Sequence, residues 1–175
     1  METELKIEVP SLDPIRRRLE QLGATSSGSV DEDNVYFDQD DALRARDESL
    51  RLRRDNDVRL TWKGPTDYRK GVLNREELEI HVDDYDKTWG ILEHLGFSAN
   101  DRLAKRRETW KLSGQEVVLD ELAFGRFVEI EGDATRIREI ARQLDLNPED
   151  GIARSYRWIQ AERRPGSSST EPKPE

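Results

Sequence analysis

Charged side chains recur at every second position in several stretches of this chain, beginning at its start. Glu2, Glu4, Lys6 and Glu8 alternate there with Thr3, Leu5, Ile7 and Val9. The later stretches hold Arg51 and Arg53, Arg59 and Lys63, Arg75, Glu77, Glu79 and His81, Lys105, Arg107 and Lys111, and Glu129 and Glu131. Successive side chains of a β-strand point to opposite faces. Each stretch therefore predicts a strand with one charged face and one mostly apolar face.

These predicted strands are sorted by the sign of their charges. Carboxylates dominate the first and the last stretch, whereas arginine and lysine dominate those between them. One charged face is typical of a solvated strand, but a solvated sheet would mix both signs. Like charges on facing strands repel one another unless counter-ions lie between them. The pattern therefore favours one cavity that binds a polyanion together with cations.

The composition excludes several classes of protein and of site. The 175 residues carry a formal net charge of −9, which argues against a general nucleic-acid binder because such proteins need a basic surface. Without cysteine the chain has no disulfide and no thiolate chemistry, and its two histidines leave little room for a zinc site. No apolar run approaches the roughly 20 residues that span a bilayer, so we expect a cytoplasmic protein that does not bind membranes.

A repeated pattern predicts the order of the elements. The strand at 4–9 precedes an amphipathic helix that ends at Gly23, and the strand at 77–82 precedes one that ends at Gly96. Ser11 and Asp83 are the expected N-caps of these helices, and a looser third copy has Asp133 as its expected cap. The remaining strands are expected at about 30–38, 49–54, 57–63, 101–112, 115–122 and 127–131.

About eight antiparallel strands and these helices predict an α+β fold in a single domain, residues 1–163. A sheet of this size can close into a barrel, which removes its exposed edges. We expect a closed or nearly closed eight-stranded antiparallel β-barrel whose charged face points inward and whose apolar face is covered by peripheral helices. Segment 64–73 is predicted to be a loop, and 164–175, rich in proline, serine and glutamate, a disordered tail.

Other polar and aromatic residues are assigned to structure rather than to the site. The acidic run Asp31–Asp33 is interpreted as a feature of composition, and Glu77 and Glu79 are expected to pair with neighbouring arginines. Neither His81 nor His94 is a candidate for catalysis. The four tryptophans are expected in the core, because aromatic side chains are usually buried.

Eight motifs that follow one another along the chain resemble those of a known family. They are Glu2-x-Glu4-x-Lys6, Leu50-Arg51-Leu52-Arg53, Lys63-Gly64-Pro65, Arg75-x-Glu77-x-Glu79, Lys105-Arg106-Arg107-x-x-Trp110, Leu119-Asp120-Glu121, Gly125-x-Phe127-x-Glu129-x-Glu131 and Ser155-Tyr156. From residue 1 to about 160 the chain resembles the CYTH family, and within it the class IV adenylyl cyclase branch. The resemblance implies a triphosphate tunnel, a barrel that binds a triphosphate and divalent metal, Mg²⁺ or Mn²⁺, inside.

The resemblance also implies roles for the charged residues. The expected metal ligands are Glu2, Glu4, Asp120, Glu129 and Glu131. The residues expected to bind the substrate are Lys6, Arg51, Arg53, Lys63, Arg75, Lys105 and Arg107. Among these, Lys6, Arg53 and Lys63 are candidates for catalysis. Lys6 would act as a base only if neighbouring cations lower its pKa.

Two reactions and one non-enzymatic role stay open. An adenylyl cyclase, our first choice, would convert ATP into cyclic AMP and pyrophosphate. A triphosphatase would instead hydrolyse inorganic triphosphate, thiamine triphosphate or a nucleoside triphosphate. A sensor of phosphorylated metabolites would keep the arginines and lose the carboxylates, so the carboxylates of this chain argue against it. Outward apolar strips also allow a homodimer, as the relatives suggest.

Overall fold

The computed structural model describes residues 2–69 and 72–163, without the side chains of Glu2 and Arg69. The predicted tail, 164–175, lies outside the described residues. The strands are β1 (Glu2–Val9), β2 (Thr25–Asp38), β3 (Ser49–Arg54), β4 (Val58–Lys63), β5 (Asp67–Arg69), β6 (Val72–Arg75), β7 (Glu77–His81), β8 (Ser98–Leu112), β9 (Gln115–Leu122) and β10 (Gly125–Glu131). The helices are α1 (Asp13–Gln21), α2 (Tyr85–His94), α3 (Ala134–Gln143) and α4 (Tyr156–Glu162), with 3-10 turns η1 (Arg44–Arg46) and η2 (Pro148–Asp150).

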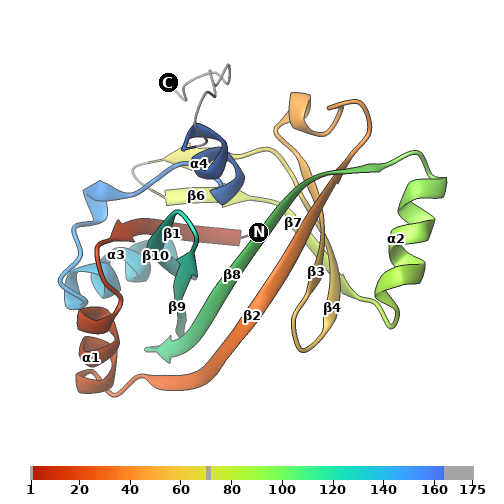
Figure 1. Ribbon diagram of the computed structural model, residues 1–175. Coiled ribbons are helices and arrows are strands. Elements are labelled where there is room, and N and C mark those ends of the chain that lie inside the picture. The colour runs from red at the N-terminus through yellow and green to blue at the C-terminus, as the bar shows by residue number, and fades with distance from the viewer. Residues whose placement is uncertain (1, 70–71, 164–175) are drawn as a thin grey trace.

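The described strands form one antiparallel sheet of ten, in the order β5-β6-β1-β10-β9-β8-β2-β3-β4-β7. The α+β class and the antiparallel sheet with peripheral helices are confirmed, with two strands more than expected. Figure 1 shows how the sheet bends, with β1, β6 and β10 on one side of the long strands β2 and β8, and β3, β4 and β7 on the other. The end strands β5 and β7 do not pair with each other, so hydrogen bonds between described strands do not close the sheet.

The additional strands come from the segment 64–73, which is not the plain loop that the sequence predicts. It contains β5 and the first residues of β6. Because β6 pairs with the start of β1, Leu73 lies opposite Glu4, and the ladder satisfies the backbone groups of this segment. Residues 64–66 lie between β4 and β5 outside any strand, and there the loop prediction holds.

The helix ends follow the predicted chemistry, with a shift at two N-termini. Asp133 caps α3 as predicted, since its carboxylate accepts hydrogen bonds from two backbone N–H groups of the first turn. Gly23 and Gly96 take positive φ angles of 74° and 89° after α1 and α2. The N-cap of α2 is Asp84 rather than Asp83, and that of α1 is Leu12, while Ser11 Oγ accepts a hydrogen bond from Asp13 N before the helix begins.

The hydrophobic core lies on the outer face of the sheet, as the alternation predicts. Leu5 and Ile7 of β1 and Val128 and Ile130 of β10 pack against α1 and α3, which lie beside these strands in Figure 1. A second cluster joins α2 to the outer faces of β2 and β3. Its members include Phe37, Leu52, Trp89 and Leu92. Of the tryptophans, Trp110 is buried, whereas Trp62, Trp89 and Trp158 are half-buried.

The inner face is not charged along its whole length. At one end, Leu103 of β8, Leu122 of β9 and Phe127 of β10 share the face of the charged residues and pack against Tyr156 and Ile159 of α4. Helix α4 therefore covers an apolar end of the concave face, a contact that the sequence does not predict. None of the helices in the described part of the chain has the length and apolar character needed to cross a membrane.

Candidate active site

Strand register places the charged motifs side by side on the inner face. Lys6 of β1 lies opposite Glu129 of β10, and Glu4 lies opposite Glu131. On the next pair of strands, Arg107 of β8 lies opposite Asp120 of β9. Residues that are far apart in the sequence thus meet because four consecutive strands of the sheet, β1, β10, β9 and β8, carry them at matching positions.

Three carboxylates form the group best suited to a metal ion. Carboxylate oxygens of Glu4, Glu129 and Glu131 all lie within 4.8 Å of one another, with Glu4 and Glu129 buried and Glu131 half-buried. An all-carboxylate set of this kind fits hard divalent cations such as Mg²⁺ and Mn²⁺, which prefer oxygen ligands. The side chain of Glu2 lies outside the described residues, while its backbone pairs with Arg75 of β6.

Asp120, the fifth predicted metal ligand, lies beside this group and is engaged by basic side chains. Its carboxylate accepts hydrogen bonds from Lys105 Nζ at 2.8 Å, from Arg107 Nε at 2.8 Å and Nη2 at 2.6 Å, and from the Tyr156 hydroxyl at 2.9 Å. These four bonds use the lone pairs that a fully buried carboxylate offers. Asp120 therefore orients two cations of the inner face.

Lys6 is surrounded by carboxylates. Its Nζ lies 3.0 Å from Glu4 Oε1 and 3.0 Å from Glu129 Oε1. Burial lowers the pKa of Lys6, but attraction to Glu4 and Glu129 outweighs burial and raises that pKa above its ordinary value. The lowered pKa that a base at this position requires is not found, because the nearest charges are anions rather than the expected cations. Lys6 is an ammonium group suited to binding anions.

Arg107 joins the two acidic residues of neighbouring strands. Its guanidinium donates to Asp120 and also to Glu129. Burial lowers the pKa of Arg107, yet Asp120, Glu129 and Glu32 together raise it well above the ordinary value. Burial likewise raises the pKa of Glu129, while Lys6 and Arg107 bring it well below its usual range. The Arg107 guanidinium and the Glu129 carboxylate are therefore both ionised, and their opposite charges compensate each other.

The remaining predicted anion-binding residues lie on β3, β4 and β6. Arg53 Nε donates to Asn34 Oδ1 at 3.1 Å, and burial and the like charge of Arg51 lower the pKa of Arg53 to about 10. Lys63 pairs with Glu77 at 3.2 Å. Arg75 is half-buried at the end of β6.

Arg51 carries a buried donor that could bind an anion. Its Nη2 lies 3.8 Å from Glu79, while its buried Nε has no hydrogen-bond partner among the residues that the structure describes. A buried unpaired donor is costly unless a ligand satisfies it. Glu79 thus pairs with an arginine as predicted, and Glu77 pairs with Lys63.

Glu32 is a site residue that the sequence analysis missed. Its side chain is 1% exposed and lies 3.3 Å from Arg53, 3.6 Å from Lys105 and 3.9 Å from Arg107. Burial raises the pKa of Glu32, but these three cations lower it to about 2. The signal was present, because Glu32, Asn34 and Tyr36 alternate with residues such as Val35 and Phe37, but the acidic run around Glu32 concealed it.

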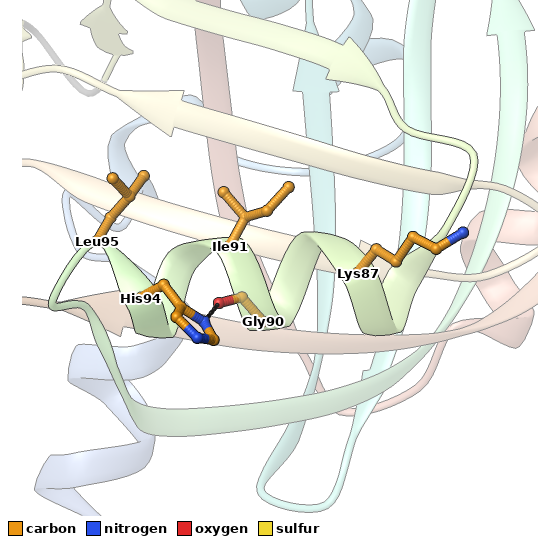
Figure 2. A pocket seen from close by; sticks show the side chains of 5 residues that line it. All are labelled: Lys87, Gly90, Ile91, His94 and Leu95. Carbon is orange, nitrogen blue, oxygen red and sulfur yellow. Dashed lines mark hydrogen bonds between the residues drawn. The ribbon is translucent and has the colours of Figure 1, made fainter.

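An apolar pocket on α2 is separate from this site. It is lined by Lys87, Gly90, Ile91, His94 and Leu95, which Figure 2 shows along one side of the helix. Helix α2 packs on the outer face of the sheet, whereas the charged residues occupy the inner face. His94 Nδ1 lies 2.7 Å from the Gly90 carbonyl oxygen, so this histidine is engaged within its own helix, in keeping with its exclusion from the candidates.

Known proteins resemble this chain over most of its length. A curated relative from Methanocaldococcus jannaschii, named "Putative adenylate cyclase MJ0240", is 28% identical over 169 residues, covering 89% of this chain and 96% of its own. The solved structure of the PH1012 protein from Pyrococcus horikoshii is 29% identical, covers 89% of this chain and 97% of its own, and superposes with a TM-score of 0.78.

A more distant structure shares the fold. The structure of the "Putative adenylyl cyclase HpAC1" from Hippeastrum, described as revealing a dominant triphosphatase activity, is 18% identical and superposes with a TM-score of 0.67, covering 83% of this chain and 89% of its own. The model of the CYTH domain matches residues 1–156, which include every charged residue of the inner face described above. The chain therefore belongs to the CYTH domain family.

Proposed function

We propose that this protein is a divalent-metal-dependent enzyme that binds the triphosphate of ATP on the inner face of its sheet and converts ATP into cyclic AMP and pyrophosphate. The observation that carries the proposal is the buried group of Glu4, Glu129 and Glu131 beside Lys6 and Arg107. Carboxylates that can hold a metal and cations that can hold phosphate lie in direct contact, as the binding of a metal–triphosphate complex requires.

Glu4, Glu129 and Glu131 would hold Mg²⁺ or Mn²⁺. Glu2 and Asp120 are proposed as further ligands from the family pattern, and Asp120 would exchange one of its hydrogen bonds for the metal. When bound, such a metal neutralises phosphate charge and lowers the pKa of a nearby hydroxyl or water. Lys6 and Arg107 both pair with Glu129. If Glu129 binds a metal ion instead of Lys6 and Arg107, these two cations are placed to turn toward phosphate oxygens.

The arginines and lysines supply the positive charge that a triphosphate needs. Arg51, Arg53 and Arg107 can each donate two parallel hydrogen bonds to phosphate oxygens, and Lys63, Lys105 and Arg75 add further charge. In the cyclase reaction the ribose 3′-hydroxyl attacks the α-phosphorus, and pyrophosphate leaves with the bonding electrons of the broken P–O bond. Arg53 and Lys63 are proposed to stabilise the charge that develops on this leaving group. Lys6 is proposed to bind phosphate as an ammonium ion.

The naming of the archaeal relative as an adenylate cyclase supports the first choice. Hydrolysis of a triphosphate is the second candidate. The charged and polar groups assembled on the inner face suit phosphate and metal, and nothing in their geometry requires a nucleoside. The Hippeastrum protein of the same fold, with its dominant triphosphatase activity, is in keeping with this alternative.

Product analysis distinguishes the two reactions. Purified protein is incubated with ATP, or with inorganic triphosphate, in the presence of Mg²⁺ or Mn²⁺, and the products are separated by chromatography. Cyclic AMP together with pyrophosphate establishes the cyclase. ADP and phosphate, or cleavage of inorganic triphosphate alone, establishes the triphosphatase. The absence of all these products with either metal would refute both reactions.

The homodimer stays a prediction. Among the described residues, Leu78, Ile80, Ile91 and Leu95 are large apolar side chains that are mostly exposed. Sedimentation velocity over a range of protein concentrations tests the prediction, and a monomer at every concentration would remove it.

A further inference from the structure

Tyr156, the first residue of α4, contacts two lysines of the inner face, Lys6 and Lys105. Lys6 Nζ lies 4.6 Å from the centre of its ring, and Lys105 Nζ lies 5.1 Å from the same centre. The hydroxyl group donates a hydrogen bond of 2.9 Å to Asp120, the carboxylate that also holds Lys105 and Arg107. One buried side chain thus contacts three charged groups of the site.

The ring itself is held rigidly by the rest of the fold. Phe127 packs edge to face against it with ring centres 5.0 Å apart, and Ile159 packs in the same cluster. Ser155 caps α4 through a hydrogen bond from Trp158 N to its side chain. Beyond the helix, Arg163 pairs with Glu8 of β1 at 2.7 Å. These contacts anchor the helix at both ends. The ring of Tyr156 is therefore held in place beside the longer side chains of Lys6 and Lys105.

We propose that Tyr156 is a positioning residue for the triphosphate: its ring fixes the ammonium groups of Lys6 and Lys105, and its hydroxyl fixes Asp120 between Lys105 and Arg107. This inference rests on the proposed function, because it assigns a role within the same site. The sequence motif Ser155-Tyr156 contributed to the family resemblance without any role for the tyrosine in the site.

The positions of Lys6 and Lys105 in the sheet explain why a shared ring would help them to bind the triphosphate. Lys6 is on β1 and Lys105 is on β8, with β10 and β9 between them. Their long side chains would each lose rotamer freedom on binding an anion. Carboxylates hold each ammonium group, and a ring that attracts both cations adds to the order that exists before the ligand arrives.

Two substitutions separate the ring from the hydroxyl. Tyr156→Phe keeps the ring under both lysines and removes only the hydrogen bond to Asp120, whereas Tyr156→Leu removes both. We expect the dissociation constant of inorganic triphosphate, measured by calorimetry, to rise about 10-fold or more in Tyr156→Leu and clearly less in Tyr156→Phe. The Mn²⁺ affinity, measured without triphosphate by electron paramagnetic resonance, should change by the same factor in both variants, because both lose the hydrogen bond to Asp120 and the ring itself contacts the lysines.

Ile159→Ala is the matched control. Ile159 is buried in the same cluster on α4, but no contact joins it to either lysine. The inference predicts that Ile159→Ala lowers the melting temperature and leaves triphosphate affinity nearly unchanged. Equal losses of affinity in Ile159→Ala and Tyr156→Leu, or in Tyr156→Phe and Tyr156→Leu, would overturn the role of the ring. A wild-type protein that binds no triphosphate would instead refute the proposed function itself.

Discussion

Lys6 and Glu129 face each other across the β1–β10 ladder, and Lys6 Nζ lies 3.0 Å from Glu129 Oε1. Arg107 reaches the same carboxylate from β8. Buried ion pairs of this kind often add little net stability, because desolvation of the charges offsets their attraction. Glu129 therefore matters less for stability than as the residue that links the carboxylates of the site to its cations.

Glu129→Gln should abolish metal-dependent turnover. The substitution removes a negative charge from the group of three carboxylates and keeps the size of the side chain. Turnover should fall by about 100-fold or more, since even the loss of a group that supports a metal ligand costs about 10- to 100-fold. Glu121→Gln on the exposed side of β9 is the control, because Glu121 pairs only with Arg126 among the ion pairs found. Unchanged turnover and Mn²⁺ affinity in Glu129→Gln would refute the metal assignment.

Arg53→Ala should mainly weaken binding of the triphosphate. Hydrogen bonds to charged groups contribute about 1.5–3 kcal/mol, so we expect the dissociation constant to rise about 10- to 100-fold. Arg53→Lys should recover only part of the affinity, because lysine lacks the planar fork of donors. Arg54→Ala changes the next residue, which is exposed and pairs with Asp33 on the outside. Calorimetric titration of all three variants should leave Arg54→Ala close to the wild type.

Glu32 should make the protein sensitive to acid. The pKa of Glu32 is about 2 in the folded protein, below its ordinary value of 4.5, so the folded state binds fewer protons than the unfolded chain between these values. The stabilisation from Glu32 is therefore complete above about pH 4.5 and is lost as the pH falls toward 2. Urea denaturation across this interval should show a smaller decline in the free energy of unfolding for Glu32→Gln. Parallel declines in the two proteins would contradict the ion pairs of Glu32.

Ile137→Ala should destabilise the fold and leave the site intact. Ile137 of α3 is fully buried in the cluster on the outer face of the sheet. Removing its side chain should cost about 2–5 kcal/mol of the free energy of unfolding. Leu78→Ala, at a side chain that is 60% exposed, should cost within about 0.5 kcal/mol. Triphosphate affinity measured well below the melting temperature should match the wild type in both variants.

Period-two alternation made much of the fold and the site predictable. It correctly separates Leu5 and Ile7, which enter the core, from Glu4 and Lys6, which lie on the inner face. Local cap chemistry likewise predicted the ends of the helices to within one residue. Strand β6 was missed because its pairing with β1 is a long-range contact that a short segment does not encode, and β5, only three residues long, pairs with β6.

The missed parts of the site also depend on long-range contacts. Tyr156 approaches the lysines only because α4 packs against the apolar end of the inner face. The condition under which Lys6 would act as a base, a pKa lowered by neighbouring cations, could not be checked from the sequence, which does not show that Glu4 and Glu129 are the closest charges. The position of Tyr156 and the charges nearest to Lys6 both depend on strand order and on the distances between side chains, which the sequence does not show.

The outward position of the hydrophobic core separates two kinds of evolutionary constraint within each strand. In β1, Leu5 and Ile7 hold the strand against α1 and α3, while their neighbours Glu4 and Lys6 face the charged interior. Changes at distant, independent positions combine nearly additively, and opposite faces of one strand share few partners. Selection for a different anion can therefore alter the inner residues as a connected group, while the outer residues keep the fold unchanged.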